Sequence, residues 1–313
     1  MKFKEYLSFF RWPNLVIIVL SMIFMHRLVI LPLLHIPEAM PAGYFLLLLS
    51  AVLSITAAGY VINDYFDIDT DYVNKPGRNK VGSLISENSA LNLFYVLSAF
   101  GIISGAVLSW MVNEINFTLI FLFTAGILWY YSQRYKCMPV TGNLVVSFLS
   151  ALSFGLVWLF DFFALKNNPV MFTKAQNGFA IVSKIVFIYM IFAFLSSFFR
   201  ELIKDMEDME GDKTVGCRTF AVVKGIKKSK YLASAAGIIL LLLLIWSQIF
   251  FYRLGFYLLF GYFLIMDAFL LLMLYKLKES ADIVDFYNLS DMAKIFMFLG
   301  ILSMPVIFFE TVF

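Results

Sequence analysis

The chain has 313 residues, of which 62% are hydrophobic, 18% aromatic and only 14% charged, and its formal net charge is +3. A soluble domain cannot bury so large an apolar fraction, so the composition indicates a polytopic membrane protein. The basic residues are spread over many short segments instead of forming one patch, so no nucleic-acid partner is expected.

The first segment, residues 1–11, predicts a short amphipathic helix lying on the membrane surface. Phe3, Leu7 and Phe10 stand at positions i, i+4 and i+7, with Lys and Glu between them. This spacing puts the three apolar side chains on one face of a helix, which suits the interface between lipid and water.

Nine apolar runs follow, each of a length that can cross a hydrocarbon core of about 30 Å. The predicted fold class is therefore all-α, with nine transmembrane helices in one domain covering residues 1–313. The predicted spans are 14–34, 43–66, 90–111, 117–131, 140–160, 181–203, 231–252, 256–275 and 292–312.

The distribution of Lys and Arg predicts the orientation. With the N-terminus in the cytoplasm, 19 of the 24 basic residues fall on the inner side. Short translocated loops avoid positive charge, so we expect a multi-pass protein of the cell's inner (plasma) membrane. Residues 67–89 and 204–230 are then the predicted cytoplasmic loops.

The two cysteines, Cys137 and Cys217, are far apart in the sequence and belong to no paired spacing. The spacing predicts neither a disulfide framework nor a zinc site. Both fall in predicted cytoplasmic loops, where thiols stay reduced.

The ends of the second and sixth predicted spans carry two acidic motifs of the same spacing. Each motif has three aspartates at i, i+3 and i+7, so on a helix they lie within roughly 60° of one another. Each aspartate of the second motif stands 141 positions after its counterpart, and four crossings separate the motifs, so both lie on the inner side. The six residues are Asp64, Asp67, Asp71, Asp205, Asp208 and Asp212.

These six carboxylates are the predicted metal ligands and catalytic residues. Carboxylates repel one another and are costly at the edge of a membrane, so a cation is needed to neutralise them. Mg²⁺ prefers hard oxygen ligands and commonly binds through carboxylates, water and phosphate oxygens. The polar residues expected to bind the metal-bound phosphates are Asn63, Lys75, Arg78, Lys136, Lys213 and Arg218.

Apolar and aromatic helices lie behind this polar region. A ligand with a charged head and a long hydrocarbon tail fits both, and isoprenyl diphosphates have this form. Mg²⁺ assists loss of the diphosphate from an allylic carbon, which a nucleophile on a lipophilic acceptor then captures. No obligate protein partner is expected.

Two other classes of function are also compatible with a membrane protein. Intramembrane acids mark ion paths in transporters and channels, although the spans hold few charged residues beyond Asp161 and Asp267, near predicted helix ends. A non-catalytic membrane scaffold gives no reason for two matched metal-type motifs.

The chain resembles the UbiA superfamily of intramembrane prenyltransferases. Residues 63–71 match its N-D-x-x-D-x-x-x-D motif and residues 205–212 its second D-x-x-D-x-x-x-D motif. Residues 11–14 (Arg-Trp-Pro-Asn), residues 74–78, Tyr131 with Lys136, and Gly142 with Asn143 also resemble family segments. The resemblance implies nine helices around a central cavity open to the cytoplasm, Mg²⁺ dependence, and prenyl transfer from a diphosphate to a lipophilic acceptor.

Within that family, residues 200–212 look most like the branch that prenylates geranylgeranylglyceryl phosphate on its free hydroxyl, making ether lipids. Relatives that prenylate aromatic rings for quinones, haem or pigments share much of this stretch and are the alternative. The sequence identifies neither the length of the prenyl chain nor the base.

Overall fold

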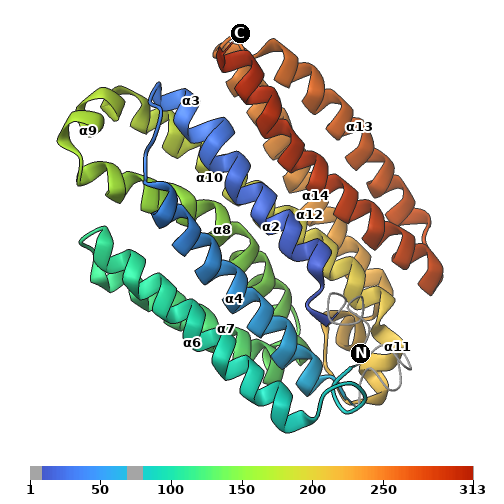
Figure 1. The fold of residues 1–313 in the computed structure, drawn as a ribbon. Coiled ribbons are helices and arrows are strands. Elements are labelled where there is room, and N and C mark those ends of the chain that lie inside the picture. The colour runs from blue at the N-terminus through green and yellow to red at the C-terminus, as the bar shows by residue number, and fades with distance from the viewer. Residues whose placement is uncertain (1–8, 69–79, 313) are drawn as a thin grey trace. The chain divides into compact units, whose positions relative to one another are not determined.

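The computed structural model describes residues 9–68 and 80–312, and these are almost entirely helical. Within these ranges the only β pairing is a bridge between Val81 and Ile85. The helices in chain order (Figure 1) are α2 (Trp12–Phe24), η1 (Met25–Ile30), α3 (Leu31–Leu34), α4 (Ala42–Phe66), α6 (Glu87–Met111), η2 (Ile115–Phe117), α7 (Thr118–Gln133), η3 (Tyr135–Cys137), α8 (Thr141–Lys166), α9 (Pro169–Ala175), η4 (Gln176–Gly178), α10 (Phe179–Glu207), α11 (Met209–Thr214), α12 (Phe220–Arg253), α13 (Tyr257–Glu279) and α14 (Ile283–Val312).

Nine helical segments within the described residues are long and apolar enough to cross a membrane, which confirms the nine predicted spans. The largest difference lies at α12, which begins at Phe220 although the apolar run begins at Tyr231. Gly225, with φ 79° and ψ 163°, is not helical and separates residues 220–224 from the rest of α12. Lys224, Lys227 and Lys228 around this kink are exposed. A helix can continue beyond the bilayer into water, where hydropathy no longer marks it.

The chain divides into two compact units where the sequence predicted one domain. Unit 1 comprises Met1–Met22, Glu38–Lys136 and Leu159–Thr173, and unit 2 comprises Ile23–Pro37, Cys137–Trp158 and Lys174–Phe313. The amphipathic helix predicted for residues 1–11 falls mostly on residues 1–8, which lie outside the described residues.

In unit 1, helix α6 packs between α4 and α7 through two glycines. A Cβ atom at Gly101 would lie 2.6 Å from Cγ1 of Ile55 on α4, and one at Gly105 would lie 2.3 Å from Cδ2 of Phe121 on α7. Small residues allow close helix packing in membranes, so both positions require glycine. Helix α6 begins at Glu87, and the Ser86 hydroxyl caps it by accepting a hydrogen bond from Ser89 N.

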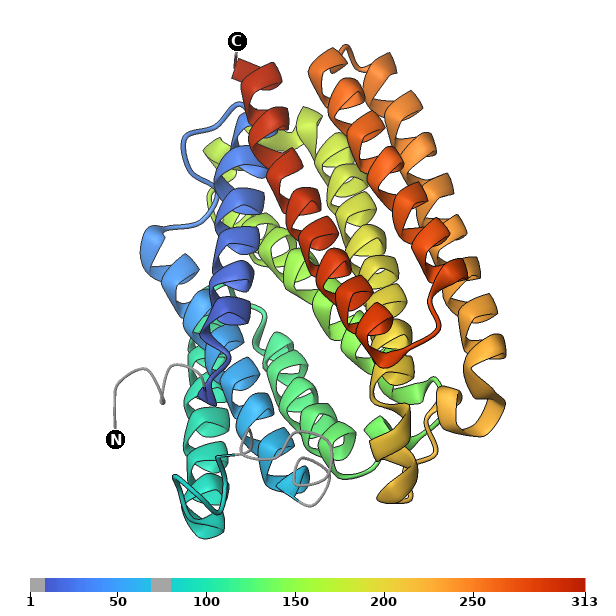
Figure 2. The same ribbon diagram turned by 90° about the vertical axis from the view of Figure 1, so that its right-hand side faces the viewer.

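In unit 2, helix α10 packs against α12 and α14, and α13 packs against α12 and α14 (Figure 2). Gly300 on α14 faces Phe192 on α10, where a Cβ atom would lie 2.2 Å from the ring. The Phe192 ring also lies 5.5 Å from that of Phe296. The long helix α10, which carries the second acidic motif at its end, is therefore held by several neighbours.

We predict that Gly105→Ala lowers the thermal unfolding temperature of the detergent-solubilised protein. The added methyl group meets the ring of Phe121, which is 1% exposed and has little room to move. Overpacking of this kind costs about 1–3 kcal/mol. Gly126→Ala on α7 is the matched control, because nothing lies within 4 Å of its Cβ position. Equal melting temperatures for the two variants would contradict this account of the packing.

Candidate functional site

The first acidic motif lies at the end of α4, and the helix breaks inside it. Helix α4 ends at Phe66, and Asp67 has φ −96° and ψ 6°, with its N–H donating to the carbonyl of Asn63 at 2.9 Å. The sequence predicted a stripe on a continuous helix, and this is wrong at Asp67. A peptide at ψ near 0° redirects the chain, so positions after it no longer follow the 100° rotation.

The side chain of Asp64 pairs with Arg11, the residue just before α2. Arg11 Nη2 donates to Asp64 Oδ1 at 2.7 Å, and the guanidinium lies 5.0 Å from the centre of the Tyr60 ring. Burial lowers the pKa of Arg11, but the charges of Asp64, Tyr60 and Asp67 outweigh it and the pKa is raised overall. Arg11 therefore stays ionised beside Asp64.

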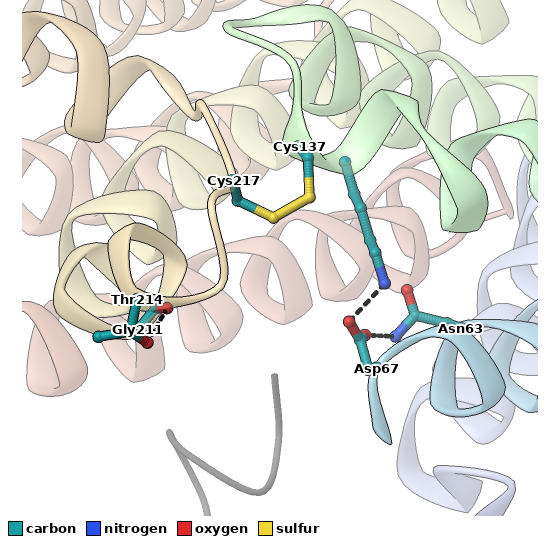
Figure 3. The surroundings of a disulfide bond; sticks show 7 residues. Asn63, Asp67, Cys137, Gly211, Thr214 and Cys217 are labelled. Carbon is teal, nitrogen blue, oxygen red and sulfur yellow. Dashed lines mark hydrogen bonds and ion pairs between the residues drawn. A yellow bond between two sulfur atoms is a disulfide. The ribbon is translucent and has the colours of Figure 1, made fainter. Parts of the chain in front are cut away.

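The side chain of Asp67 has two partners, both among the predicted site residues (Figure 3). Asn63 Nδ2 donates to Asp67 Oδ2 at 2.5 Å. Lys136 Nζ donates to Asp67 Oδ1 in an ion pair in which both side chains are mostly buried. Unit 1 thus brings Asn63, Asp67 and Lys136 together, as a phosphate and metal site requires.

The second motif, in unit 2, repeats the helix break of the first. Helix α10 ends at Glu207, and Asp208 has φ −89° and ψ 3°, with its N–H donating to the carbonyl of Lys204 at 2.9 Å. Each of these positions stands 141 residues after its counterpart in the first motif. Helix α11 then begins at Met209 and holds Asp212. The repeat noted in the sequence is therefore also present in the backbone.

Two partly buried acids on the last turns of α10 have distinct partners. Asp205 accepts a hydrogen bond from Asn143 Nδ2 on α8, with 3.0 Å between Nδ2 and Oδ2. Glu201, one turn earlier, is 8% exposed and pairs with Arg200 Nη1 at 2.5 Å. Asp205 is thus held by a neutral amide.

The segment after the second motif is mostly helical, where the sequence predicted a cytoplasmic loop over 204–230. Only residues 215–219 lie between α11 and α12. Lys213 and Arg218 are exposed, and the backbone N–H of Arg218 donates to the carbonyl of Cys137 at 3.0 Å. The basic side chains of this segment are therefore accessible to a ligand.

Cys137 and Cys217 form a disulfide, which corrects the prediction of unpaired thiols (Figure 3). Their Cα atoms lie 4.5 Å apart although 80 residues separate them in the chain. The spacing gave no signal because folding, not local sequence, brings residue 217 onto the segment before α8. The bond ties the segment that follows Asp212 to the segment that follows Lys136.

Three predicted site residues, Asp71, Lys75 and Arg78, lie outside the described residues. Two partners of the motif aspartates, Arg11 and Asn143, were absent from the predicted site, although both stand in segments that resemble the UbiA family. Among the residues that the structure describes, no three His, Cys, Asp or Glu side chains converge on one metal position. The motif oxygens are nevertheless the hard donors that Mg²⁺ takes, and one or two protein carboxylates per ion suffice.

Comparison with known proteins establishes the family. The sequence pattern of the UbiA prenyltransferase family matches residues 15–302. The chain belongs to the UbiA prenyltransferase family. The matched region includes both acidic motifs, all or most of each membrane span, and residues of both compact units.

Similar UbiA proteins include archaeal enzymes named digeranylgeranylglyceryl phosphate synthase. The one from Korarchaeum cryptofilum is 31% identical over 80% of this chain and 80% of its own. The one from Methanobrevibacter smithii is 33% identical over 62% of this chain, and the match spans 63% of that relative. The match therefore spans less than two thirds of the length of the Methanobrevibacter smithii relative.

Solved structures support the UbiA fold. A structure of a digeranylgeranylglyceryl phosphate synthase has a TM-score of 0.66 and 26% identity, covering 98% of both chains. A UbiA homologue from Archaeoglobus fulgidus has a TM-score of 0.59 and 17% identity, covering 96% of this chain and 99% of its own. The prediction of an all-helical, nine-span UbiA fold is therefore confirmed.

We predict that mild oxidation of the solubilised protein yields one intramolecular cross-link between the peptides containing Cys137 and Cys217, detectable by mass spectrometry. The short Cα–Cα distance is within the range for disulfides, so no large movement is needed. Alkylation should then label no thiol before reduction and two after it. In Cys137→Ser one thiol should react without reductant. Complete alkylation of the oxidised wild-type protein would contradict the pairing.

Proposed function

We propose that this chain is a Mg²⁺-dependent intramembrane prenyltransferase that moves an isoprenyl group from its diphosphate to a lipophilic acceptor. The observation that carries the proposal is the pair of aspartate motifs. In each motif the middle aspartate, Asp67 or Asp208, directly follows the last residue of an apolar helix. The family match favours this function over the transporter and the scaffold.

The proposed metal ligands are the six motif aspartates, Asp64, Asp67, Asp71, Asp205, Asp208 and Asp212. The Archaeoglobus fulgidus homologue was solved bound to GPP and Mg²⁺, which supports a divalent cation and a prenyl diphosphate at this fold. Bound Mg²⁺ would supply positive charge to the diphosphate as it becomes a leaving group.

The basic residues of the site are proposed to bind the diphosphate oxygens. In unit 1, Lys136 and Arg11 each bind a motif aspartate. A cation beside a carboxylate can also face an anionic ligand, and Arg suits bidentate contact with phosphate. Lys213 and Arg218, which follow the second motif, are exposed. They are also proposed to bind diphosphate oxygens, as are Asn63, Lys75 and Arg78.

The reaction breaks the bond between the allylic carbon and the diphosphate oxygen and forms a bond from that carbon to the acceptor. With a hydroxyl acceptor the new bond is an ether, the hydroxyl proton passes to a base, and diphosphate leaves. The apolar helices around the site would exclude water, which otherwise competes for the allylic cation.

The proposed acceptor is geranylgeranylglyceryl phosphate. Its support is the name shared by the relatives, digeranylgeranylglyceryl phosphate synthase, at 30–36% identity. An aromatic ring, as in quinone, haem or pigment biosynthesis, is the second candidate acceptor, because residues 200–212 resemble relatives of that kind.

We also propose that the N-terminus and the active site face the cytoplasm and that the protein resides in the plasma membrane. The support is the inner-side placement of 19 of 24 basic residues. The multi-pass character itself follows from the nine apolar helices.

We predict that Asp64→Asn and Asp205→Asn each reduce release of diphosphate from an allylic prenyl diphosphate by about 10²-fold or more, since each removes a proposed ligand of the Mg²⁺ that would stabilise the leaving group. The assay uses purified protein in detergent with Mg²⁺. Asp291→Asn is the control, because Asp291 pairs with Lys294 on α14 outside both motifs. Wild-type activity in either motif variant would overturn the proposal.

The acceptor is tested by mass spectrometry of products from the wild-type protein, prenyl diphosphates of several lengths, and a panel of acceptors. We expect an ether product from geranylgeranylglyceryl phosphate and no prenylated ring. A prenylated aromatic product alone would replace the proposed acceptor with the second candidate.

A further inference from the structure

The contact between Asn143 and Asp205 differs in kind from the contacts of the first motif. In unit 1, the carboxylates of Asp64 and Asp67 are each bound by a cation, Arg11 and Lys136. In unit 2, the partner of Asp205 is an uncharged amide. A cation places a positive charge beside the carboxyl group, whereas a neutral amide N–H orients that group without adding charge.

The amide of Asn143 is itself held in a fixed position. Asn143 is 5% exposed, and its backbone carbonyl accepts a hydrogen bond from the Ser147 hydroxyl at 2.6 Å. Its side-chain amide therefore lies in a buried setting. A buried donor without a partner would cost about 1–3 kcal/mol, so the bond to Asp205 is maintained.

The register between α8 and α10 fixes which residue of α10 meets Asn143. The two helices run antiparallel within unit 2, and paired contacts between them continue along the part of α8 that belongs to this unit. The pairs are Trp158 with Ser183 (3.0 Å), Gly155 with Met190 (3.0 Å from a Cβ built at Gly155), Ser150 with Ser197 (3.3 Å) and Asn143 with Asp205 (3.0 Å).

We propose that Asn143 is a positioning residue for the second acidic motif: it binds Asp205 Oδ2 and thereby presents Oδ1 of that side chain to a divalent cation. The proposal rests on the proposed function and adds a residue to it. Groups that hydrogen-bond a metal ligand orient it, and their loss commonly weakens metal binding about 10- to 100-fold.

The test replaces Asn143 with Leu, which has a similar volume and no donor. Mn²⁺ binding is measured by electron paramagnetic resonance on the full-length protein in detergent, with inorganic pyrophosphate present. We expect the Mn²⁺ dissociation constant of Asn143→Leu to rise about 10- to 100-fold. Asn143→Gln, which keeps the amide, should recover part of the loss. In the activity assay, raising Mg²⁺ should restore the turnover of Asn143→Leu.

The matched control is Ser150→Ala, which removes a hydrogen bond of the same α8–α10 contact two turns from Asn143. If Asn143 only joined the helices, both variants would lower the unfolding temperature alike and neither would change Mn²⁺ binding, which would overturn the proposal. Weakened Mn²⁺ binding in Asn143→Leu with an unchanged unfolding temperature supports it.

The same experiment separates this inference from the proposed function. If wild-type protein binds Mn²⁺, Asp205→Asn loses it, and Asn143→Leu binds as wild type, then the role of Asn143 is wrong and the prenyltransferase proposal stands. If wild-type protein neither binds Mn²⁺ with pyrophosphate nor releases diphosphate from a prenyl substrate, the proposed function fails and the inference fails with it.

Discussion

The structure depends on placing carboxyl groups at the ends of apolar helices. A carboxyl group in that position loses much of its hydration, so donors or cations must replace the lost water. Arg11 does this for Asp64, Lys136 and Asn63 for Asp67, and Asn143 for Asp205. All of these partners except Asn63 come from other segments of the chain, so the acidic motifs require the fold around them.

The two motifs share their backbone and differ in their partners. Each has a helix that ends one residue before its middle aspartate, and each places that aspartate in the same non-helical conformation. The cations in unit 1 suit contact with phosphate oxygens, while the amide beside Asp205 in unit 2 is proposed to orient a ligand for a metal ion.

Sequence patterns predicted the features that local physics determines. Apolar length predicted the nine spans, because a bilayer requires about 20 apolar residues. The breaks at Asp67 and Asp208 were missed, because the 3+4 spacing also suits an unbroken helix. Arg11 as the partner of Asp64, Asn143 as the partner of Asp205, and Cys137 as the partner of Cys217 depend on contacts between residues 53 to 80 positions apart. Periodicity carries no information on such contacts.

The most direct test of the central claim is anomalous diffraction from crystals of the protein grown with Mn²⁺ and an unreactive prenyl diphosphate analogue. The account predicts Mn²⁺ peaks about 2.1 Å from carboxylate oxygens of both aspartate motifs. It also predicts that analogue phosphate oxygens complete the coordination and that Asn143 remains bonded to Asp205. A bound analogue whose diphosphate lies away from both motifs, with no Mn²⁺ at any of the six aspartates, would contradict it.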